Sequence, residues 1–561
     1  MAIVGGGPVG LLLALLLDRH GVRSVVFNAE LGVREQPRGS THNARTMEHY
    51  RRLGLSGQVR RLGLPWDHPT GISFFTRYAG FELCRLPHPP EAELLRATEE
   101  APCTDQVPEP QHRANQMYVE RLLLETAATR PGITLRFGRA VRAIRQNAAG
   151  VTIHSEPAGV RGEPEVTRAA YAVGCDGGRS LVRRTLGIGY AGAGSIDQDI
   201  LGRTAIAAHL RVPELYTELL GHRRAWSYWA INNELALNLI ALDGRDQFFL
   251  LTSSVDAATV DASVLANLVR RAIGADHRVE VLDYRPWTPG AALVAERFGA
   301  GRVLLAGDAV HLFTPNGGFG MNTGMDDAAN LAWKLAAAVH GWAGPGLVAS
   351  YETERRPIAL RNTAAARELN VGLGAIGRPA ALEEDSPAGA EARRRVGQQL
   401  ADYGLRTLDT LGVQLGARYD ESPIVAADPA DVPPVDRFHE YHPSGVPGGR
   451  TPHVWLSDAH HGRRSLYDLL GSNFTVLRLG GRAEDAGPLC GAAARLGVPV
   501  TVLDVPLDAA RELYGRDLAL VRPDQHLAWR GNRIPDDPEA LLRTVSGGLG
   551  HTTRCARWLW P

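Results

Sequence analysis

Short apolar runs followed by glycine-rich turns recur along the chain. The first run, Ala2–Val4, leads through Gly5, Gly7 and Gly10 into a long leucine-rich stretch, and Val22–Phe27 then forms a second apolar run. A short apolar run before a glycine turn and a longer one after it are typical of a strand, a turn and a helix. The amino terminus therefore predicts a βαβ unit that carries the G-x-G-x-x-G pattern of a dinucleotide cradle.

The same order of elements returns between residues 303 and 334. A buried strand ends at Gly307-Asp308, a glycine-rich loop follows, and an amphipathic helix runs on from about residue 322 through Lys334. A carboxylate at the carboxyl end of a strand can accept hydrogen bonds from sugar-like hydroxyls, while glycines let backbone amides approach a flat ring. The following helix points its positive end at that ring. The segment predicts an isoalloxazine site with Asp308 at the ribityl chain and Asn322 at the flavin edge, whereas His311 is interpreted as structural.

A third apolar run delivers an acidic residue to a turn in the middle of the chain. The run from Tyr171 ends at Asp176-Gly177, and Arg179-Ser180 opens a short helix. Taken alone, an Asp-Gly turn with a serine cap explains this segment equally well. The order of the three segments gives it weight as part of a flavin site.

Together these motifs resemble the class A, single-component flavoprotein monooxygenases, the group of p-hydroxybenzoate hydroxylase and phenol hydroxylase. Arg38, Arg45 and Gln116 are further matches to that family. The position at the end of the second strand, which is usually acidic, is Asn28, and Glu30 follows two residues later. Either residue can hydrogen-bond a ribose hydroxyl. The resemblance implies that FAD is bound by Gly5, Gly7, Pro8, Val9, Gly10, Asn28, Glu30, Arg38, Arg45, Gln116, Asp176, Gly307, Asp308, Pro315, Gly318, Gly320, Met321 and Asn322.

The resemblance also implies the chemistry. NADPH or NADH reduces FAD, O2 adds to give a flavin hydroperoxide, and one oxygen passes to an electron-rich, phenolic arene. The backbone around Pro315, Gly317 and Gly318 is expected to hold the hydroperoxide, and no residue is assigned as a base. A Baeyer-Villiger or oxidative-rearrangement monooxygenase, or a flavin-bound ligand-binding protein, remains open on the same scaffold. A halogenase is disfavoured because Trp226 to Ile231 lacks the W-x-W-x-I-P spacing.

The chain is expected to be an α/β protein in several parts. A Rossmann-like FAD-binding domain (GR2-type) comprises residues 1–70, 105–188 and 295–370, and residues 71–104 and 189–294 carry the alternation of a mainly antiparallel sheet that covers the flavin. Candidates for an aromatic substrate pocket on its inner face are Trp226, Tyr228, Trp229, Phe249 and Trp287, although such residues more often belong simply to the core.

The carboxyl-terminal part follows a helical segment and linker at residues 371–437. Residues 438–561 carry strand-like runs such as Phe474–Leu479 around a helical stretch, and they resemble the thioredoxin-like C-terminal domain of the phenol hydroxylase branch. They lack a C-x-x-C, so a structural or homodimer-contact role is expected. The segments Gly448–His453 and Ser465–Gly471 are similar to those of large-substrate hydroxylases of aromatic polyketide pathways.

Composition narrows the class of protein. The 561 residues include 61 basic and 61 acidic residues, and this zero net charge argues against a nucleic-acid partner. The five cysteines have no disulfide-scaffold or metal-ligand spacing, so reduced thiols in a cytoplasmic protein without a metal are expected. No run approaches the about 18 apolar residues of a membrane span.

Overall fold

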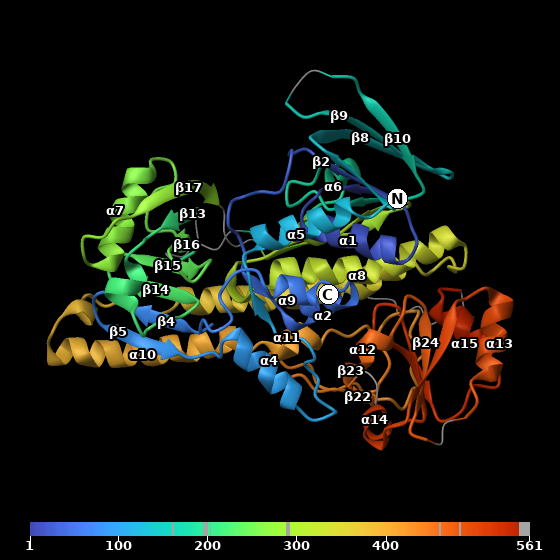
Figure 1. Cartoon of the computed structure of the whole chain (residues 1–561). Helices are drawn as coiled ribbons and strands as arrows, with labels where there is room; N and C mark the ends of the chain where they lie inside the picture. The colour runs from blue at the N-terminus through green and yellow to red at the C-terminus, as the bar shows by residue number, and fades with distance from the viewer. Residues whose placement is uncertain are drawn as a thin grey trace, which may run out of the picture. The chain divides into compact units, whose positions relative to one another are not determined.

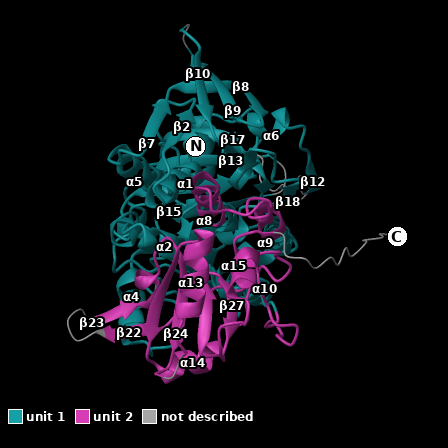
Figure 2. Cartoon of the chain, turned by 90° about the vertical axis from the view of Figure 1, so that its right-hand side faces the viewer, with its two compact units in different colours: residues 1–329, 356–416, 436–441 teal, residues 330–355, 417–435, 442–561 magenta. Residues whose placement is uncertain are grey.

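The computed structural model describes residues 1–159, 162–194, 200–201, 204–287, 292–458, 462–481 and 484–548 (Figure 1). They form two compact units (Figure 2). Unit 1 contains Met1–Ala329, Arg356–Gly416 and Asp436–Tyr441, and unit 2 contains Asn330–Arg355, Ala417–Val435 and the described residues from His442 onward. The predicted substrate-sheet regions and most of the predicted FAD-binding domain thus lie in unit 1, but residues 330–355 of that predicted domain belong to unit 2. The carboxyl-terminal unit is larger than the expected 438–561 domain, because two earlier segments belong to it.

A mainly parallel sheet forms the dinucleotide-binding part of unit 1. Its strand order is β19-β20-β11-β1-β2-β7, and only its β19–β20 pair is antiparallel. Three central strands, β1, β11 and β20, are apolar and fully buried, as expected for strands covered on both faces. Helices α1 and α5 pack against each other and against this sheet (Figure 1). The bounds are β1 (Ala2–Val4), α1 (Pro8–Arg19), β2 (Ser24–Asn28), α5 (Gln116–Ala128), β7 (Ile133–Phe137), β11 (Ala172–Gly174), β19 (Gly299–Ala300) and β20 (Val303–Leu305).

A seven-stranded sheet forms the second layer of unit 1. Its order is β17-β13-β16-β15-β14-β4-β5, with β14 and β4 parallel and the other neighbours antiparallel. One face packs against the apolar side of α7, and the other packs against α9 and α10. We call the second face the inner face. The bounds are β4 (Ile72–Phe75), β5 (Glu82–Leu86), β13 (Ala205–Arg211), β14 (Ser227–Ile231), β15 (Ala236–Ala241), β16 (Gln247–Thr252), α7 (Ala262–Ile273), β17 (Glu280–Trp287), α9 (Ser350–Gly374) and α10 (Pro387–Leu408).

Two stretches of the predicted sheet domain are helices. Residues Glu91–Glu100 form α4, and Ala262–Ile273 form α7, which Asp261 caps by accepting a hydrogen bond from the amide of Val264. Both stretches are rich in alanine, leucine, glutamate or arginine, which favour helix over strand. The regions expected to form a mainly antiparallel sheet therefore also contain two helices, α4 and α7.

Smaller elements complete unit 1. Small sheets are β3 (Thr41–His42) with β6 (His112–Arg113), β8 (Arg139–Asn147) with β9 (Gly150–Pro157) and β10 (Glu165–Ala169), and β12 (Tyr190–Ala193) with β18 (Ala292–Ala295) and β21 (His311–Leu312). The remaining helical segments are α2 (Ala44–Arg52), α3 (Ser56–Val59), α6 (Leu181–Thr185), η1 (Leu215–Leu220), η2 (Gly307–Ala309), η3 (Asn316–Gly318), η4 (Ala380–Glu383) and α11 (Leu411–Leu415), and α8 (Phe319–His340) begins in this unit.

Unit 2 is a thioredoxin-like α/β unit, as expected. Its four-stranded sheet has the order β25-β24-β26-β27, in which only β24 and β25 are parallel. The strands predicted from Phe474 and Val500 are present with the helix between them. The bounds are β22 (Trp455–Asp458), β23 (Gly462–Ser465), α12 (Leu466–Leu469), β24 (Phe474–Leu479), α13 (Gly487–Leu496), β25 (Val500–Val505), α14 (Asp508–Tyr514), β26 (Leu518–Val521), β27 (Leu527–Gly531) and α15 (Pro538–Val545).

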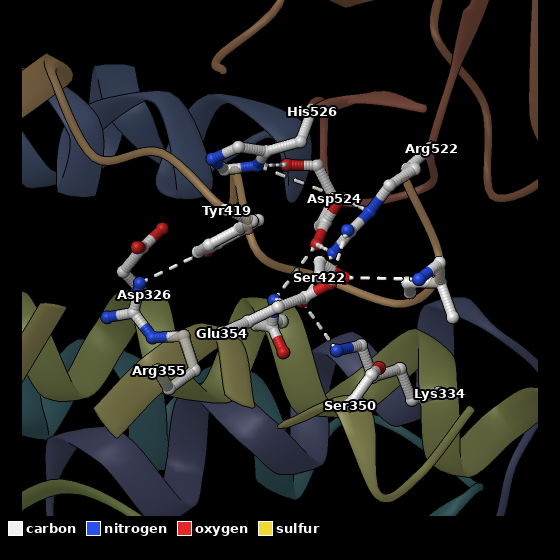
Figure 3. Close-up of polar contacts among 12 residues, drawn as sticks. Asp326, Lys334, Ser350, Glu354, Arg355, Tyr419, Ser422, Arg522, Asp524 and His526 are labelled. Atoms are coloured by element: carbon white, nitrogen blue, oxygen red, sulfur yellow. Dashed lines mark hydrogen bonds and ion pairs between the residues drawn. The ribbon is translucent and has the colours of Figure 1, made fainter. Parts of the chain in front are cut away.

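A buried ion network holds parts of unit 2 together (Figure 3). The carboxylate of Glu354 accepts hydrogen bonds from Arg522 Nη1 at 2.6 Å, from Lys334 Nζ at 2.6 Å and from Ser422 Oγ at 2.6 Å. Arg522 also pairs with Asp524, and all four charged side chains are almost fully buried. The network thereby joins the segment 330–355, the segment 417–435 and the strands of unit 2, which explains why those segments belong to it.

Among the described residues, Cys84, Cys103, Cys175 and Cys490 are free thiols. Cys555 lies outside the described part of the chain. In the ranges that the structure covers, no helix combines the length and the apolar character that a bilayer crossing needs.

Candidate functional site

In the first turn of the βαβ unit, Gly7 has open space beside it for a ligand, whereas Gly5 and Gly10 lie too close to neighbouring backbone to carry a side chain. A Cβ on Gly5, whose φ is +114°, would lie 2.2 Å from the carbonyl oxygen of Cys175. A Cβ on Gly10 would lie 2.0 Å from the carbonyl oxygen of Gly5. At Gly7 nothing beyond the chain neighbours lies within 4 Å of that position. Gly7 is the N-cap of α1, so its open face lies at the positive end of the helix, which suits a pyrophosphate.

The end of β2 contacts the glycine turn. The side-chain oxygen of Asn28 accepts a hydrogen bond from the amide of Gly6 at 3.2 Å, and its side-chain nitrogen donates to the carbonyl of Glu30 at 3.3 Å. The carboxylate of Glu30 pairs with Arg34. Asn28 therefore positions the turn, and the choice between Asn28 and Glu30 as ribose ligand stays a prediction.

The carboxyl end of β20 presents an accessible acid. Asp308 lies in η2 and is accessible to solvent. The protein that surrounds its carboxyl nevertheless displaces much of the water there, and this desolvation raises the pKa of the carboxyl above the ordinary value. The hydroxyl of Tyr190 donates to the backbone carbonyl of Asp308 at 2.6 Å, and Arg38 is close enough to act electrostatically on the carboxyl. Burial in turn lowers the pKa of Arg38, whose Nε makes no hydrogen bond to a described residue. A reachable but poorly hydrated carboxylate is suited to accept hydrogen bonds from ligand hydroxyls.

The loop after β21 reaches α8 through two left-handed glycines. Gly317 has φ +80° and Gly318 has φ +66°, conformations that side chains rarely adopt. Helix α8 begins at Phe319, earlier than expected from the sequence, so Gly320, Met321 and Asn322 lie in its first turn. This places the positive end of the helix at the glycines rather than after residue 322.

Asn322 ties this loop to the segment around residue 42. Its side-chain oxygen accepts a hydrogen bond from the amide of Asn43 at 3.0 Å. Its side-chain nitrogen donates to the carbonyls of Thr41 at 2.9 Å and Gly318 at 2.6 Å. Asn322 therefore fixes the backbone of the loop, and sequence reasoning missed Thr41 and Asn43 because they lie about 280 residues away in the chain.

Two acidic residues of α8 support the site and were not predicted. Asp327 accepts hydrogen bonds from His311 Nε2 at 2.7 Å and from the amide of Gly307 at 3.2 Å, and it is fully buried. Asp326 accepts from Arg45 Nε at 3.4 Å and contacts His49 Nε2 at 3.0 Å. The only available signal was the unusual pair of acids on an otherwise apolar helix.

Two predicted cofactor ligands make contacts within the protein. Asp176 accepts from the hydroxyl of Ser180 at 2.5 Å and from the amide of Val182 at 3.1 Å, and so caps α6. The side-chain amide of Gln116 donates to Glu120, and the backbone amide of Gln116 donates to the carbonyl of Gly39 at 2.8 Å. Roles of these two residues at the cofactor stay predictions.

The candidate pocket residues divide between the two faces of the seven-stranded sheet. Trp229 and Phe249 belong to the apolar cluster of the inner face, and the half-buried Trp287 packs against that cluster. The half-buried Trp226 packs against the clusters of both faces. Tyr228 lies in the opposite cluster with α7, since neighbouring residues of a strand point to opposite faces. Tyr228 therefore lies on the face opposite Trp229 and Phe249, and the role of these residues at a substrate pocket stays a prediction.

The parallel sheet, the open turn at Gly7, the reachable acid at Asp308 and the left-handed glycines before α8 define a dinucleotide-binding oxidoreductase fold. These features fit FAD, whose pyrophosphate, ribityl hydroxyls and flat ring need respectively a helix N-terminus, an acceptor and close backbone approach.

Comparison with known proteins specifies the class. A family model described as "FAD binding domain" matches residues 1–366, and one described as "Aromatic-ring hydroxylase, C-terminal" matches residues 444–550. A putative polyketide hydroxylase of Streptomyces halstedii is 33% identical, over 97% of this chain and 95% of its own. Aklavinone 12-hydroxylase RdmE of Streptomyces purpurascens is 32% identical, over 97% of each chain. The solved structure of RebC with bound 7-carboxy-K252c has a TM-score of 0.86 and 34% identity, over 98% of this chain and 99% of that one.

The chain belongs to the family of FAD-dependent aromatic-ring hydroxylases. It is a monooxygenase that uses FAD as cofactor and NAD(P)H as co-substrate, which confirms the family, the cofactor and the class of reaction expected from its sequence.

Proposed function

We propose that this monooxygenase hydroxylates a large, phenolic aromatic substrate of the polyketide type, which binds between the loop 315–322 and the inner face of the seven-stranded sheet. One observation carries the location. Phe319, the first residue of α8, lies in the same apolar cluster as Trp229 and Phe249 of the sheet, and Phe313 packs against that cluster. An aromatic ring bound there is next to the glycines that would hold the flavin ring.

The size and chemical nature of the proposed substrate follow from the aromatic residues of the inner face and from the names of the relatives. Aromatic side chains on the inner face offer extended contact to a planar, fused-ring molecule. Two relatives that match the chain almost from end to end are named for polyketides or for aklavinone. These names support a polyketide-type substrate, while other relatives of similar identity are named for the single-ring phenols 4-methyl-5-nitrocatechol and 2,4-dichlorophenol.

The residues of the chain would each contribute a defined function. The open face at Gly7 and the N-terminus of α1 bind the pyrophosphate, and Asp308 accepts from the ribityl hydroxyls. The amides near Gly318 face the flavin ring, and Asn322 keeps them in place. The chemistry that FAD supplies when bound is two-electron reduction by NAD(P)H followed by reaction with O2 and transfer of one oxygen atom.

Exclusion of water is the main task of the sheet. The inner face is apolar, so a reactive oxygen species next to it meets the substrate ring and few water molecules. The positive end of α8 stabilises negative charge on the ring system that it faces. Both effects position and protect, and neither needs a side-chain base.

An anaerobic experiment tests the function. The purified holoenzyme is mixed with NADPH or NADH, with and without an anthraquinone-type phenol, and flavin absorbance is followed. Bleaching, and after admission of air a product heavier by one oxygen atom, support the proposal. Absence of bleaching under all conditions contradicts it, and a ring-opened or ring-expanded product favours the Baeyer-Villiger or rearrangement alternative.

The cellular location and assembly are proposals of lesser weight. A cytoplasmic enzyme is favoured because nicotinamide nucleotides are supplied there, and the free thiols of the described residues suit a reducing compartment. A homodimer is a further expectation, which the molar mass of the holoenzyme in solution tests.

A further inference from the structure

A buried cation without a carboxylate partner lies beside the proposed substrate pocket. Arg113 is 6% exposed, and its Nη1 donates to the hydroxyl of Thr41. Within the described ranges this is its single hydrogen bond, and no described acid forms an ion pair with it. A buried charge is normally paired, because desolvation of an isolated charge costs several kcal/mol.

Among the described residues, no carboxylate pairs with Arg113. Along β6 the side chains alternate, so His112 points away from Arg113 and pairs with Glu91, which Arg60 also contacts. Two described histidines, His42 and His88, lie close enough to Arg113 to feel its charge. Burial lowers the pKa of His42 to about 3 and of His88 to about 4, so both are neutral at neutral pH.

The guanidinium lies between the flavin loop and the sheet. Its partner Thr41 pairs with it across β3 and β6, and a Cβ on Gly318 would lie 3.1 Å from the Cβ of Thr41. On its other side the guanidinium carbon lies 3.8 Å from the centre of the Trp226 ring, which packs against the apolar clusters on both faces of the sheet. Thr41 thus lies between Arg113 and Gly318, and Trp226 lies between Arg113 and the sheet.

Two donors at this point have no acceptor. Nε of Arg113 and Nε1 of Trp226 are both buried, and neither has a hydrogen-bond partner among the described residues. Unsatisfied buried donors are uncommon in folded proteins. A cation and two unsatisfied N–H groups side by side match the requirements of a ligand oxygen with negative charge.

We propose that Arg113 binds an anionic oxygen of the aromatic substrate, a phenolate or a carboxylate, and thereby selects acidic aromatic substrates. With a phenol, the cation favours the ionised form, which is the more electron-rich ring and the better acceptor of an electrophilic oxygen atom. The proton passes to solvent as the substrate binds, so no side-chain base is needed. This inference rests on the proposed function for the identity of the pocket.

Binding to the oxidised holoenzyme tests the proposal without turnover. The probes are anthraquinone-2-carboxylate, its neutral carboxamide and 2-hydroxyanthraquinone, titrated by the perturbation of flavin absorbance. We expect the carboxylate to bind at least about tenfold more tightly than the carboxamide, or the bound hydroxyl to ionise about one pH unit or more below its value in water. If the site binds a carboxylate, the affinity does not depend on pH near neutrality. If it binds a phenolate, the affinity rises with pH as the hydroxyl ionises.

Variants locate the effect. Arg113→Met is expected to remove the preference for the anion, Arg113→Lys to restore part of it, and Arg393→Met to leave it intact. Arg393 is a matched control, because its guanidinium also lies over an aromatic ring, 3.6 Å from the centre of Phe81, but hydrogen bonds to backbone carbonyls.

Three outcomes overturn the proposal. One is a folded, FAD-loaded Arg113→Met enzyme that keeps the wild-type preference. Another is loss of FAD from that variant with the preference intact after reloading, which assigns Arg113 to the cofactor. The third outcome concerns the wild-type enzyme and so does not depend on whether the variant folds. It is equal binding of the carboxylate and the carboxamide together with an unshifted pKa of the bound hydroxyl. Failure of the monooxygenase function is seen separately, as absence of flavin reduction by NAD(P)H.

Discussion

Alanine at Gly7 should weaken FAD binding, whereas alanine at Gly10 should destabilise the protein, although both glycines belong to one motif. At Gly7 the backbone is extended, with φ −79° and ψ −174°, and a Cβ meets nothing beyond the chain neighbours within 4 Å. Gly7→Ala should leave the FAD-free protein as stable as the wild type. Its methyl group should instead keep the pyrophosphate away from the backbone amides. Loss of one hydrogen bond to a charged group, about 1.5–3 kcal/mol, weakens FAD affinity by about 10- to 150-fold.

At Gly10 the methyl group meets the protein itself. Its Cβ would lie 2.0 Å from the carbonyl oxygen of Gly5, so helix α1 must move from β1. Overpacking of this kind costs about 1–3 kcal/mol, and it should destabilise the protein whether or not FAD is present. Thermal melts of the stripped and reloaded proteins and fluorimetric FAD titrations measure both quantities. Normal FAD affinity in Gly7→Ala, or a lowered melting temperature of its FAD-free form, would refute the assignment of this turn to the pyrophosphate.

Three other predictions follow from the same geometry. Glu354→Gln should lower the free energy of unfolding of the full chain by about 3–5 kcal/mol at pH 7 in urea titrations, because it removes the carboxylate of the buried Lys334 and one of the two carboxylates of the buried Arg522. Although burial opposes it, these cations hold the pKa of Glu354 below its ordinary 4.5, so the difference from wild type should shrink as the pH falls below 4.5, and a constant difference would contradict the ion-pair account. Asp308→Asn should weaken FAD binding by about tenfold, as expected for loss of a charged acceptor, while the melting temperature of the FAD-free protein stays unchanged. Trp229→Leu should raise the KM for the aromatic substrate, whereas Tyr228→Phe should change stability alone, and an equal KM effect of both would contradict the separation of the two faces.

The sequence was most informative where a local pattern determines the structure. Apolar runs with glycine turns identified β1, α1, β20 and the loop before α8, because a strand, a turn and a helix each leave a mark within about twenty residues. Alternation located β14, β15 and β16 but did not show which residue faces which side. Tyr228 was therefore grouped with Trp229, its neighbour on the opposite face.

Long-range contacts left no such mark. Arg113 meets Thr41 through two strands of two residues each, too short to show any period. Asp327 meets His311 from a helix whose other positions are mainly apolar, and Glu354 meets Arg522 across 168 residues. These contacts decide which polar groups are already satisfied inside the protein, and hence which ones are available to a ligand.

Turnover in isotopically labelled O2 tests the central claim most directly. The holoenzyme is supplied with NADPH and a phenolic polyketide-type substrate, and the product mass is compared with the NADPH consumed. The account predicts one labelled oxygen atom on the aromatic ring for each NADPH oxidised. Product oxygen that derives from water, or NADPH oxidation that yields only peroxide with every acidic aromatic substrate supplied, would contradict it.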